Sequence, residues 1–316
     1  MRRWFGLAAM ATLVVSALVG VVAAQGAAPG VQVSVLTTFD AAHGPAAVAA
    51  TNTGDVVALA GSNVVSVGPN GQQKLLTTIS GGAFGIPIGI AYDKFHQLYV
   101  ALPESFGPPA QGTILKVSPN GKQVTPVPGS EGMVAPDGFG LDSATGNMYV
   151  TDIFGNSIWR FAPGGSAQLW TSVASNPLLV LPDGVKVFNN AVYTSIEGGK
   201  ILRIPINPDG SAGTATVWAQ VSGAFFDDMV LDDRTGDVYV TRLDTNELLQ
   251  ITPGGVVTAI ATHADGLLGA ANMTLIHVGQ STVIYLANSN SDFLGTGATG
   301  GAGPAILKIT IPSPSH

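Results

Sequence analysis

Short segments in which hydrophobic and polar residues alternate run along most of the chain, and tight turns separate them. Strand-forming segments that combine aliphatic residues with a tyrosine recur at 98–100, 148–150, 192–194, 238–240 and 284–286. Pro-x-Gly turns recur as well, at 69–71, 119–121, 163–165, 208–210 and 253–255. The glycine supplies the positive φ that a tight hairpin requires. No stretch has the 3.6-residue period of an amphipathic helix, so the pattern predicts an all-β protein.

These segments repeat as a unit of about 45 residues. Aligned on the start of the first strand, the units begin at Pro45, Pro87, Pro136, Pro182, Phe226 and Ala271. Each of the first five units contains four predicted strands. Four strands at this period are typical of one blade of a β-propeller, in which stacked neighbouring units bury a continuous core. The sequence therefore predicts a six-bladed β-propeller with four-stranded blades.

The two ends of the chain support this count independently. The sixth unit stops at Pro312, after its third strand at 306–311, and lacks a fourth. The segment 31–39 contains Val-Leu-Thr-Thr-Phe, which resembles Leu-Leu-Thr-Thr-Ile in the fourth strand of the first unit. We therefore expect residues 31–39 to complete the last blade and to close the ring without an open edge. Trp170 and Trp218 occupy matching places in fourth strands and are expected to pack between blades.

The first 24 residues have the features of a secretory signal peptide. Two arginines precede an apolar run at 7–22, and small residues follow at 22–24. An uncleaved membrane anchor is the alternative, because 4–22 is nearly long enough to span a bilayer. We expect a secreted protein, extracellular or periplasmic, in which 25–30 is a spacer and 31–316 is a single propeller domain. After cleavage we expect a monomer without membrane contact.

The composition excludes several classes of function. The net charge is −7 and the basic residues are scattered, which argues against a nucleic-acid partner. The chain has no cysteine, so cysteine catalysis is excluded. No glycine-rich run follows a strand and opens a helix, which argues against a nucleotide-phosphate loop.

The candidate functional residues lie where the first strand of each unit begins. In a propeller this strand lines the central channel, and the side chain after the opening residue faces the channel mouth. Around the ring these positions hold Ala46, Ile88, Asp137, Asp183, Asp227 and Asn272. Three carboxylates and an amide on one rim repel one another unless a cation lies between them. Calcium, which takes six to eight oxygen ligands, is the favoured cation, although another divalent cation would serve. The alternative is that each acid caps its own turn.

Six further acids occupy two other places in the repeat unit. Asp93, Asp142 and Asp232 follow first strands on the opposite face and are expected to be structural. Asp152, Glu197 and Asp244 lie in second-to-third-strand loops on the candidate site face, where we expect solvated charge.

The Pro-Asp-Gly openings at 136–138 and 182–184, the six units and the acidic axis resemble the senescence-marker-protein/gluconolactonase/luciferin-regenerating-enzyme family. The resemblance implies a calcium-dependent propeller hydrolase acting on lactones or, in some relatives, on organophosphates. It assigns Asp183 and Asp227 to the family's fourth- and fifth-blade metal ligands, and Asp137 to the third-blade position near the substrate. His43 stands where the family's first blade has a glutamate before Gly-Pro.

Our first hypothesis is a hydrolase of a small lactone or ester. In it Asp137, Asp183 and Asp227 bind the metal, Asp137 and Asn272 contact the substrate, and Asp183 and His43 are catalytic. His43 could activate water as a general base, or it could be an ordinary loop histidine. A second hypothesis is a non-catalytic propeller with NHL-like blades that binds a protein, a glycan or a small molecule. A strictosidine-synthase-like activity is weaker, because it would need an axial glutamate that none of the six ring positions supplies.

Overall fold

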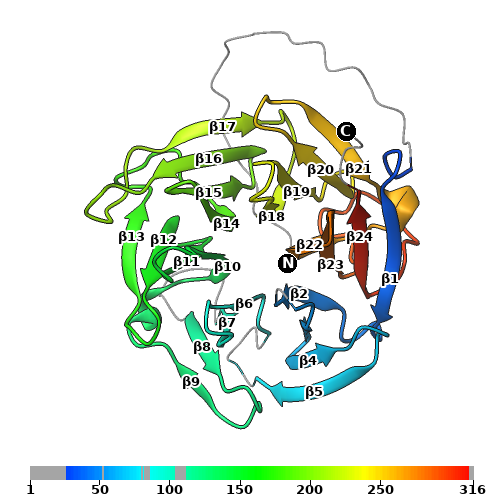
Figure 1. Cartoon of the computed structure of the whole chain (residues 1–316), viewed down its shortest axis with the longest axis horizontal. Helices are drawn as coiled ribbons and strands as arrows, with labels where there is room; N and C mark the ends of the chain where they lie inside the picture. The colour runs from blue at the N-terminus through cyan, green and yellow to red at the C-terminus, as the bar shows by residue number, and fades with distance from the viewer. Residues whose placement is uncertain (1–25, 52, 80, 82–85, 104–111, 313–316) are drawn as a thin grey trace, which may run out of the picture.

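A computed structural model describes residues 26–312 except 52, 80, 82–85 and 104–111. Six four-stranded antiparallel sheets are arranged around a central axis, and the first strand of each sheet lies innermost (Figure 1). The predicted all-β six-bladed propeller is confirmed. The predicted signal peptide at 1–24 lies outside the described residues.

The blades follow one another along the chain. Blade 1 comprises β2 (Pro45–Ala50), β3 (Val56–Ala60), β4 (Asn63–Val67) and β5 (Gln73–Thr78). Blade 2 comprises β6 (Gly89–Tyr92), β7 (Leu98–Leu102), β8 (Thr113–Val117) and β9 (Val124–Pro126). Blade 3 comprises β10 (Pro136–Leu141), β11 (Met148–Asp152), β12 (Ser157–Phe161) and β13 (Gln168–Ser172). The short 3-10 helix η1 (Ser130–Gly132) precedes blade 3.

The second half of the ring repeats this arrangement. Blade 4 comprises β14 (Pro182–Phe188), β15 (Ala191–Ile196), β16 (Lys200–Pro205) and β17 (Thr216–Gln220). Blade 5 comprises β18 (Phe226–Leu231), β19 (Val238–Arg242), β20 (Glu247–Ile251) and β21 (Val257–Ala261). Blade 6 comprises β22 (Ala270–Val278), β23 (Ser281–Asn288) and β24 (Ala305–Ile311), and η2 (His263–Asp265) precedes it.

The ring closes as the sequence predicts. Strand β1 (Gln32–Thr38) pairs antiparallel with β24 and becomes the outer strand of blade 6, so both ends of the described chain contribute to one sheet. Beyond β1, the Phe39 amide donates to Pro304 O at 2.7 Å, and Ile79 makes the corresponding bond to Ser62 in blade 1. The likeness between the two segments therefore reflects the same place in a blade.

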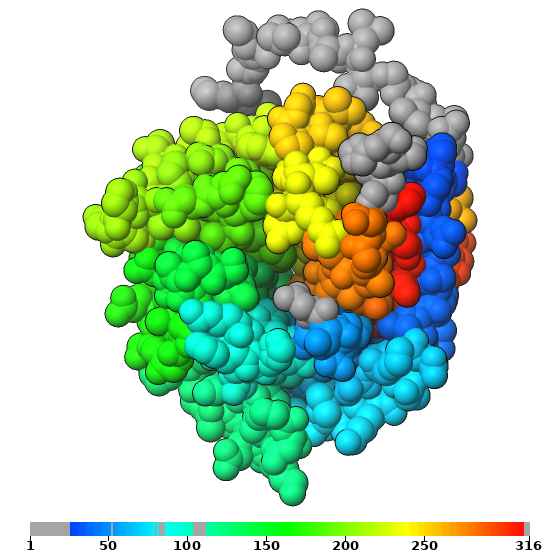
Figure 2. Space-filling model, in the orientation of Figure 1, coloured from blue at the N-terminus to red at the C-terminus, as the bar shows by residue number. Residues whose placement is uncertain are grey.

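The hydrophobic core lies between the blades. Six buried clusters occupy the six junctions between neighbouring blades, and the blades pack side by side around the ring (Figure 2). Trp170 packs against the cluster between blades 3 and 4, and its Nε1 donates to Gly210 O of blade 4. Trp218 packs against the cluster between blades 4 and 5. The predicted interblade role of both tryptophans is confirmed.

No helix among the described residues is long and apolar enough to cross a membrane.

Candidate functional site

Three carboxylates open three consecutive inner strands at one end of the ring axis. Asp137, Asp183 and Asp227 are each the second residue of their strand, in β10, β14 and β18. The opening residue of each strand pairs with the end of the second strand, as Pro182 does with Ile196, and a bulge follows in all three blades. The three side chains therefore occupy equivalent positions in neighbouring blades, as the repeat predicts.

Hydroxyl groups of the second strands fix the backbone at these positions. Thr151 of blade 3 donates to Asp183 O of blade 4, and Ser195 of blade 4 donates to Asp227 O of blade 5 at 2.6 Å. The same two hydroxyls accept from the amides of Gly138 and Gly184, at 2.9 and 2.8 Å. A Cβ at Gly138 would overlap Asp183 O, so the Asp-Gly pair allows the blades to approach this closely. The hydroxyls thus hold the Asp183 and Asp227 backbones against the neighbouring blade.

The axial carboxylates interact strongly with one another. Desolvation, followed by the charge of Asp227, raises the pKa values of Asp137 and Asp183 well above the usual range. Desolvation and the charge of Asp228 raise the pKa of Asp227 to about 7, although its hydrogen bonds to the Asp228 amide and the Asp183 side chain oppose the shift. In the absence of a cation, the group therefore retains protons near neutral pH.

Asp228 and Lys186 extend this group, and sequence reasoning missed both. Asp228 is buried, and its Oδ2 accepts from the Met273 amide of blade 6 at 3.0 Å. Its Oδ1 has no hydrogen-bond partner in the described part of the chain and lies 3.6 Å from Lys186 Nζ. The ammonium also donates to Phe139 O at 3.0 Å. Lys186 thus places one positive charge beside the acids.

Glu197 belongs to the axial group as well, in contrast to its expected role as a solvated charge. It follows β15 and donates its amide to Leu181 O, just as Ile153 and Leu243 donate to the corresponding carbonyls in blades 3 and 5. Glu197 is half-buried, and desolvation raises its pKa. Its charge contributes to the raised pKa values of the three rim aspartates. At this position blades 3 and 5 bury the aliphatic residues Ile153 and Leu243. An alignment of the repeats shows the carboxylate of Glu197 as an exception, and this exception could have identified it.

The other two loop acids are structural. Asp152 is buried, which corrects the expectation of solvated charge, and it accepts from the amides of Val134 and Ala135 at 3.0 and 2.7 Å. Asp244 accepts from the Phe225 amide at 2.8 Å and pairs with Arg242. Both carboxylates therefore anchor the residues just before an inner strand.

The backbone before Asp183 adopts an unusual conformation. Leu181 has φ of 51°, a left-handed value that costs a bulky residue about 1–3 kcal/mol. Asn156 of blade 3 holds this residue, because its Oδ1 accepts from the Leu181 amide at 2.8 Å. Such strain persists only where the surroundings enforce it, and here they fix the start of the strand that carries Asp183.

Asn272 lies one position beyond the rim. Ala270 pairs with Asn288 as Pro182 pairs with Ile196, so the equivalent of Asp183 in blade 6 is Ala271. Asn272 is buried, and its Oδ1 accepts from the Val48 amide of blade 1 at 2.9 Å. The alignment of the repeats puts Asn272 at the rim position because blade 6 opens on two alanines, and neither alanine identifies the start of the strand. A substrate contact by Asn272 stays a prediction.

His43 lies in the loop before blade 1. Its ring is half exposed, and its Nδ1 contacts both carboxylate oxygens of Asp40 at 2.8 and 2.9 Å. A Cβ on Gly61, in the β3–β4 hairpin, would lie 3.1 Å from the His43 ring. The structure thus places the three predicted aspartates at equivalent positions of neighbouring blades and pairs the predicted histidine with a carboxylate of its own loop. A catalytic role for His43 stays a prediction.

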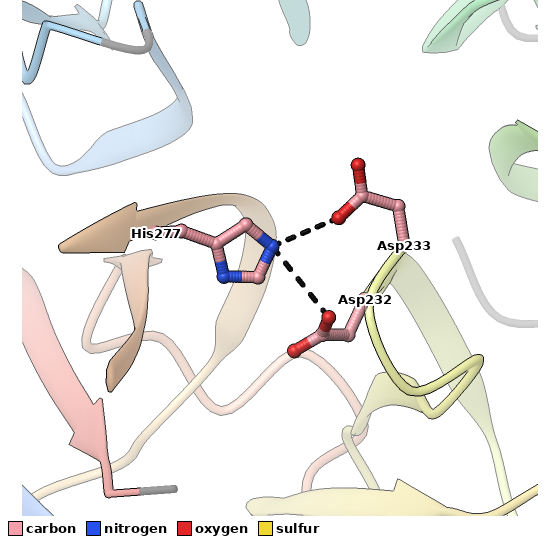
Figure 3. Close-up of side chains that lie close together, drawn as sticks. All are labelled: Asp232, Asp233 and His277. Atoms are coloured by element: carbon pink, nitrogen blue, oxygen red, sulfur yellow. Dashed lines mark hydrogen bonds and ion pairs between the residues drawn. The ribbon is translucent and has the colours of Figure 1, made fainter. Parts of the chain in front are cut away.

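A second group of possible metal ligands lies at the far end of the inner strands. Asp232, Asp233 and His277 each offer one ligand atom, and these atoms lie within 4.8 Å of one another (Figure 3). His277 Nε2 lies 2.9 Å from Asp233 and 3.5 Å from Asp232. Asp232 also accepts from Thr282 Oγ1 at 2.7 Å and from the Arg234 amide at 2.8 Å. These three residues could hold a metal ion, but their contacts also join blades 5 and 6 directly.

The axial group offers the donors of a hard cation, although in the described part of the chain the three residues whose ligand atoms all lie within 4.8 Å of one another are those of the far-end group. The axial donors are carboxylate oxygens, which calcium and magnesium prefer. Asp183 is only 6% exposed, and the charge of Asp227 raises the pKa of its carboxyl group. Buried acids that face one another are costly when ionised, and a bound cation would remove this cost.

Comparisons with known proteins place the fold. The sequence matches no protein-family profile, and no curated protein matches it. Among solved structures, a gluconolactonase from Xanthomonas campestris has a TM-score of 0.65 at 18% identity, covering 91% of this chain and 92% of its own. A putative gluconolactonase has a TM-score of 0.67 at 14% identity, covering 92% and 96%.

Virginiamycin B lyase from Staphylococcus aureus is also similar, with a TM-score of 0.59 at 13% identity, covering 89% of this chain and 99% of its own. At these identities the likeness concerns the fold. The resemblance inferred from the Pro-Asp-Gly openings and the six repeats is confirmed at this level: the chain is a six-bladed propeller, and its fold is similar to that of gluconolactonases.

Proposed function

We propose that the protein is a hydrolase of small lactones or esters that uses a divalent cation, with calcium favoured, at the axial carboxylates. One observation carries the proposal: Asp137, Asp183 and Asp227 occupy equivalent positions in three adjacent blades, and the charge of Asp227 adds to desolvation in raising the pKa values of the other two. Clustered acids with strongly raised pKa values are typical of functional sites. The shared fold with gluconolactonases supports a lactone or ester as the substrate.

The rim aspartates would hold the cation. When bound, a divalent cation polarises the substrate carbonyl and stabilises the negative charge that develops on its oxygen. Asp137, in the blade next to that of Asp183, would orient the substrate. Lys186 stabilises the buried Asp228, which lies beside the group.

Hydrolysis also requires proton transfer. Water adds to the carbonyl carbon, the bond from that carbon to the ring or ester oxygen breaks, and the departing oxygen receives a proton. Glu197 is a candidate for the group that takes the proton from water, because it is half-buried beside the axial acids and its pKa is raised. His43 remains the candidate from the sequence, and its pairing with Asp40 through Nδ1 leaves Nε2 as the atom that would accept the proton.

The direct test is hydrolysis of γ-butyrolactone, δ-gluconolactone and phenyl acetate, which is monitored through the acid that the reaction releases. We expect turnover in calcium and its loss after dialysis against a chelator, with recovery when calcium is restored. Turnover that is unaffected by chelation would remove the cation from the proposal. No turnover of any lactone or ester would reject the hydrolase function.

A non-catalytic NHL-like propeller is the second candidate, and the Lys186–Asp228 pair favours it. An ammonium 3.6 Å from a buried carboxylate supplies part of the positive charge that the axial acids require. If this charge were sufficient, the protein would need no added cation and could act by binding. Retention of all thermal stability after chelation, together with absence of turnover, would favour this candidate.

We also propose export, in keeping with the apolar segment at 7–22, and a monomeric state. Amino-terminal sequencing of the protein from the producing cell should give Gln25 as the first residue. An intact Met1 would favour the uncleaved anchor.

A further inference from the structure

Blades 3 and 4 carry exposed apolar side chains on the face of the ring where the inner strands begin. Phe154, Val173, Leu178 and Val180 are each more than a third exposed. Phe154 lies between β11 and β12, Val173 directly follows β13, and the other two precede β14. Single exposed apolar residues are ordinary, whereas a group on one surface is typical of a binding site.

Hydrogen bonds through Asn156 join these segments into one surface. The Asn156 carbonyl accepts from the Val173 amide at 2.9 Å, and its side chain accepts from the Leu181 amide at 2.8 Å. Phe154 is two residues before Asn156, and Val180 is one residue before Leu181. The loop of Phe154 and the segment of Leu178 and Val180 therefore lie side by side.

This apolar surface adjoins the axial carboxylates. Val180 and Leu181 are followed by Pro182 and Asp183, so the surface leads directly into the strand that carries a rim aspartate. On the blade 3 side, the Ile153 amide donates to Ala135 O at 3.0 Å, two residues before Asp137. A small molecule held at the carboxylates could therefore extend across Phe154 and Val180.

In blades 3 and 4, the exposed large apolar side chains of the loops lie on one face of the ring. Between residues 136 and 220, all of which are described, the other two exposed large apolar residues are Leu169 and Val217. Both lie in outer strands, β13 and β17. The turns on the opposite face, such as 142–146 and 189–190, are polar. In the loops of blades 3 and 4, exposure of large apolar side chains is thus confined to the face that holds the carboxylates, whereas blades 2 and 6 also expose Phe95 and Val278 on the opposite face.

We propose that Phe154, Leu178 and Val180 bind the aliphatic chain of the substrate, so that the preferred substrates are alkyl-substituted lactones or esters and not polyhydroxylated sugar lactones. This inference rests on the proposed hydrolase function. A sugar lactone would require hydrogen-bonding side chains at this surface, whereas an alkyl chain gains free energy from each methylene that leaves water. The carboxylate end would hold the carbonyl, and the apolar surface would set the length of the chain.

The test compares kcat/KM for γ-lactones whose alkyl chain grows from none to six carbons. We expect a rise of about threefold to fourfold for each methylene in contact with the surface. The Val180→Ser and Phe154→Ser variants should flatten this dependence. Val217→Ser is the matched control, because Val217 is 43% exposed and Val180 is 47% exposed, yet Val217 lies in an outer strand. The control should keep the wild-type dependence.

Binding provides a readout that does not depend on turnover. Cyclopentanones with the same alkyl chains cannot be hydrolysed, and their dissociation constants can be measured by the shift of protein NMR signals. Tighter binding with chain length, lost in Val180→Ser, would support the alkyl site even if no lactone were hydrolysed. Hydrolysis of lactones without any chain-length preference would overturn the inference and leave the hydrolase intact. Binding of the wild type, but not of Phe154→Ser, to phosphatidylcholine vesicles without chain-length preference would also overturn it, in favour of a membrane contact.

Discussion

Two groups of carboxylates lie at opposite ends of the inner strands, and their surroundings differ. At the far end, Asp232 accepts from Thr282 and from the Arg234 amide, and His277 lies between Asp232 and Asp233. At the site end, the charges of Asp227, Asp137 and further acids raise the pKa of Asp183. An acid with donors stabilises the fold, whereas acids that face one another need a proton or a cation. The partners of the carboxylates, and not their number, therefore distinguish a candidate site from a structural cluster.

The largest expected effect comes from exchanging one carboxylate for an amide at each end. Asp183→Asn removes a central member of the site and should lower kcat/KM about thousandfold or more, because the substrate and cation would lose their shared anchor. The control is Asp232→Asn, which should leave kcat/KM within about threefold of the wild type once its stability is allowed for. A larger loss in Asp232→Asn would place the chemistry at the far end.

The second prediction concerns proton transfer and compares Glu197 with His43, which are the two candidates for the general base. Glu197→Gln should lower kcat about a hundredfold, the typical contribution of a general base. His43→Ala should lower it less than about tenfold, because the ring is half exposed and paired with Asp40. The pH dependence of kcat in both variants is the measurement. A loss of the basic requirement in His43→Ala alone would return the general-base role to the histidine.

Stability of the cation-free protein should respond to pH in the direction set by the axial acids. The pKa of Asp227 rises from its ordinary 3.8 to about 7 on folding, so the folded state binds more protons across this window. Stability should therefore fall as pH rises from about 4 to about 7, by about 1–3 kcal/mol.

Melting temperatures at several pH values, in chelator and in calcium, test this. Calcium should reduce the fall, and Asp227→Asn should flatten the profile in chelator. If the stability of the chelated wild type rises from about pH 4 to about pH 7 and the slope changes in Asp227→Asn, the account is contradicted. If the rise has the same slope in Asp227→Asn, it comes from other groups.

A smaller effect is expected at the far end. Asp232→Asn and His277→Ala should each lower the free energy of unfolding by about 1–2 kcal/mol, because each disrupts hydrogen bonds between blades 5 and 6. Denaturant titration measures this loss. The increase in melting temperature caused by calcium should be the same as in the wild type, and its disappearance in either variant would identify Asp232, Asp233 and His277 as a calcium site.

The sequence predicts the fold well because a propeller repeats its pattern in every blade. The Pro-Asp-Gly openings and the Pro-x-Gly turns mark the period, and the segment 31–39 shows how the ring closes. The same repeat brings Asp137, Asp183 and Asp227 to equivalent positions. Blade 6 is harder to align because its first strand opens on Ala270 and Ala271, which have no distinctive sequence. The alignment of the repeats therefore assigns Asn272 to the rim, although the pairing of the strands gives that position to Ala271.

The rest of the site depends on contacts between blades that no local pattern encodes. Asp228 sits where two neighbouring blades have glycine, and its charge is buried because Lys186 of the previous blade reaches it. Glu197 takes a place that aliphatic residues fill in blades 3 and 5. The strained Leu181 is held by a side chain 25 residues earlier in the chain. These features follow from packing, and a search for exceptions to the repeat pattern is the way to find them in a sequence.

Calorimetric titration of the mature protein with calcium tests the central claim most directly, with the Asp183→Asn and Asp232→Asn variants titrated in parallel. The account predicts one site per chain in the wild type and in Asp232→Asn, and no binding in Asp183→Asn. Binding that is lost in Asp232→Asn and retained in Asp183→Asn, or no binding to the wild type at all, would contradict it.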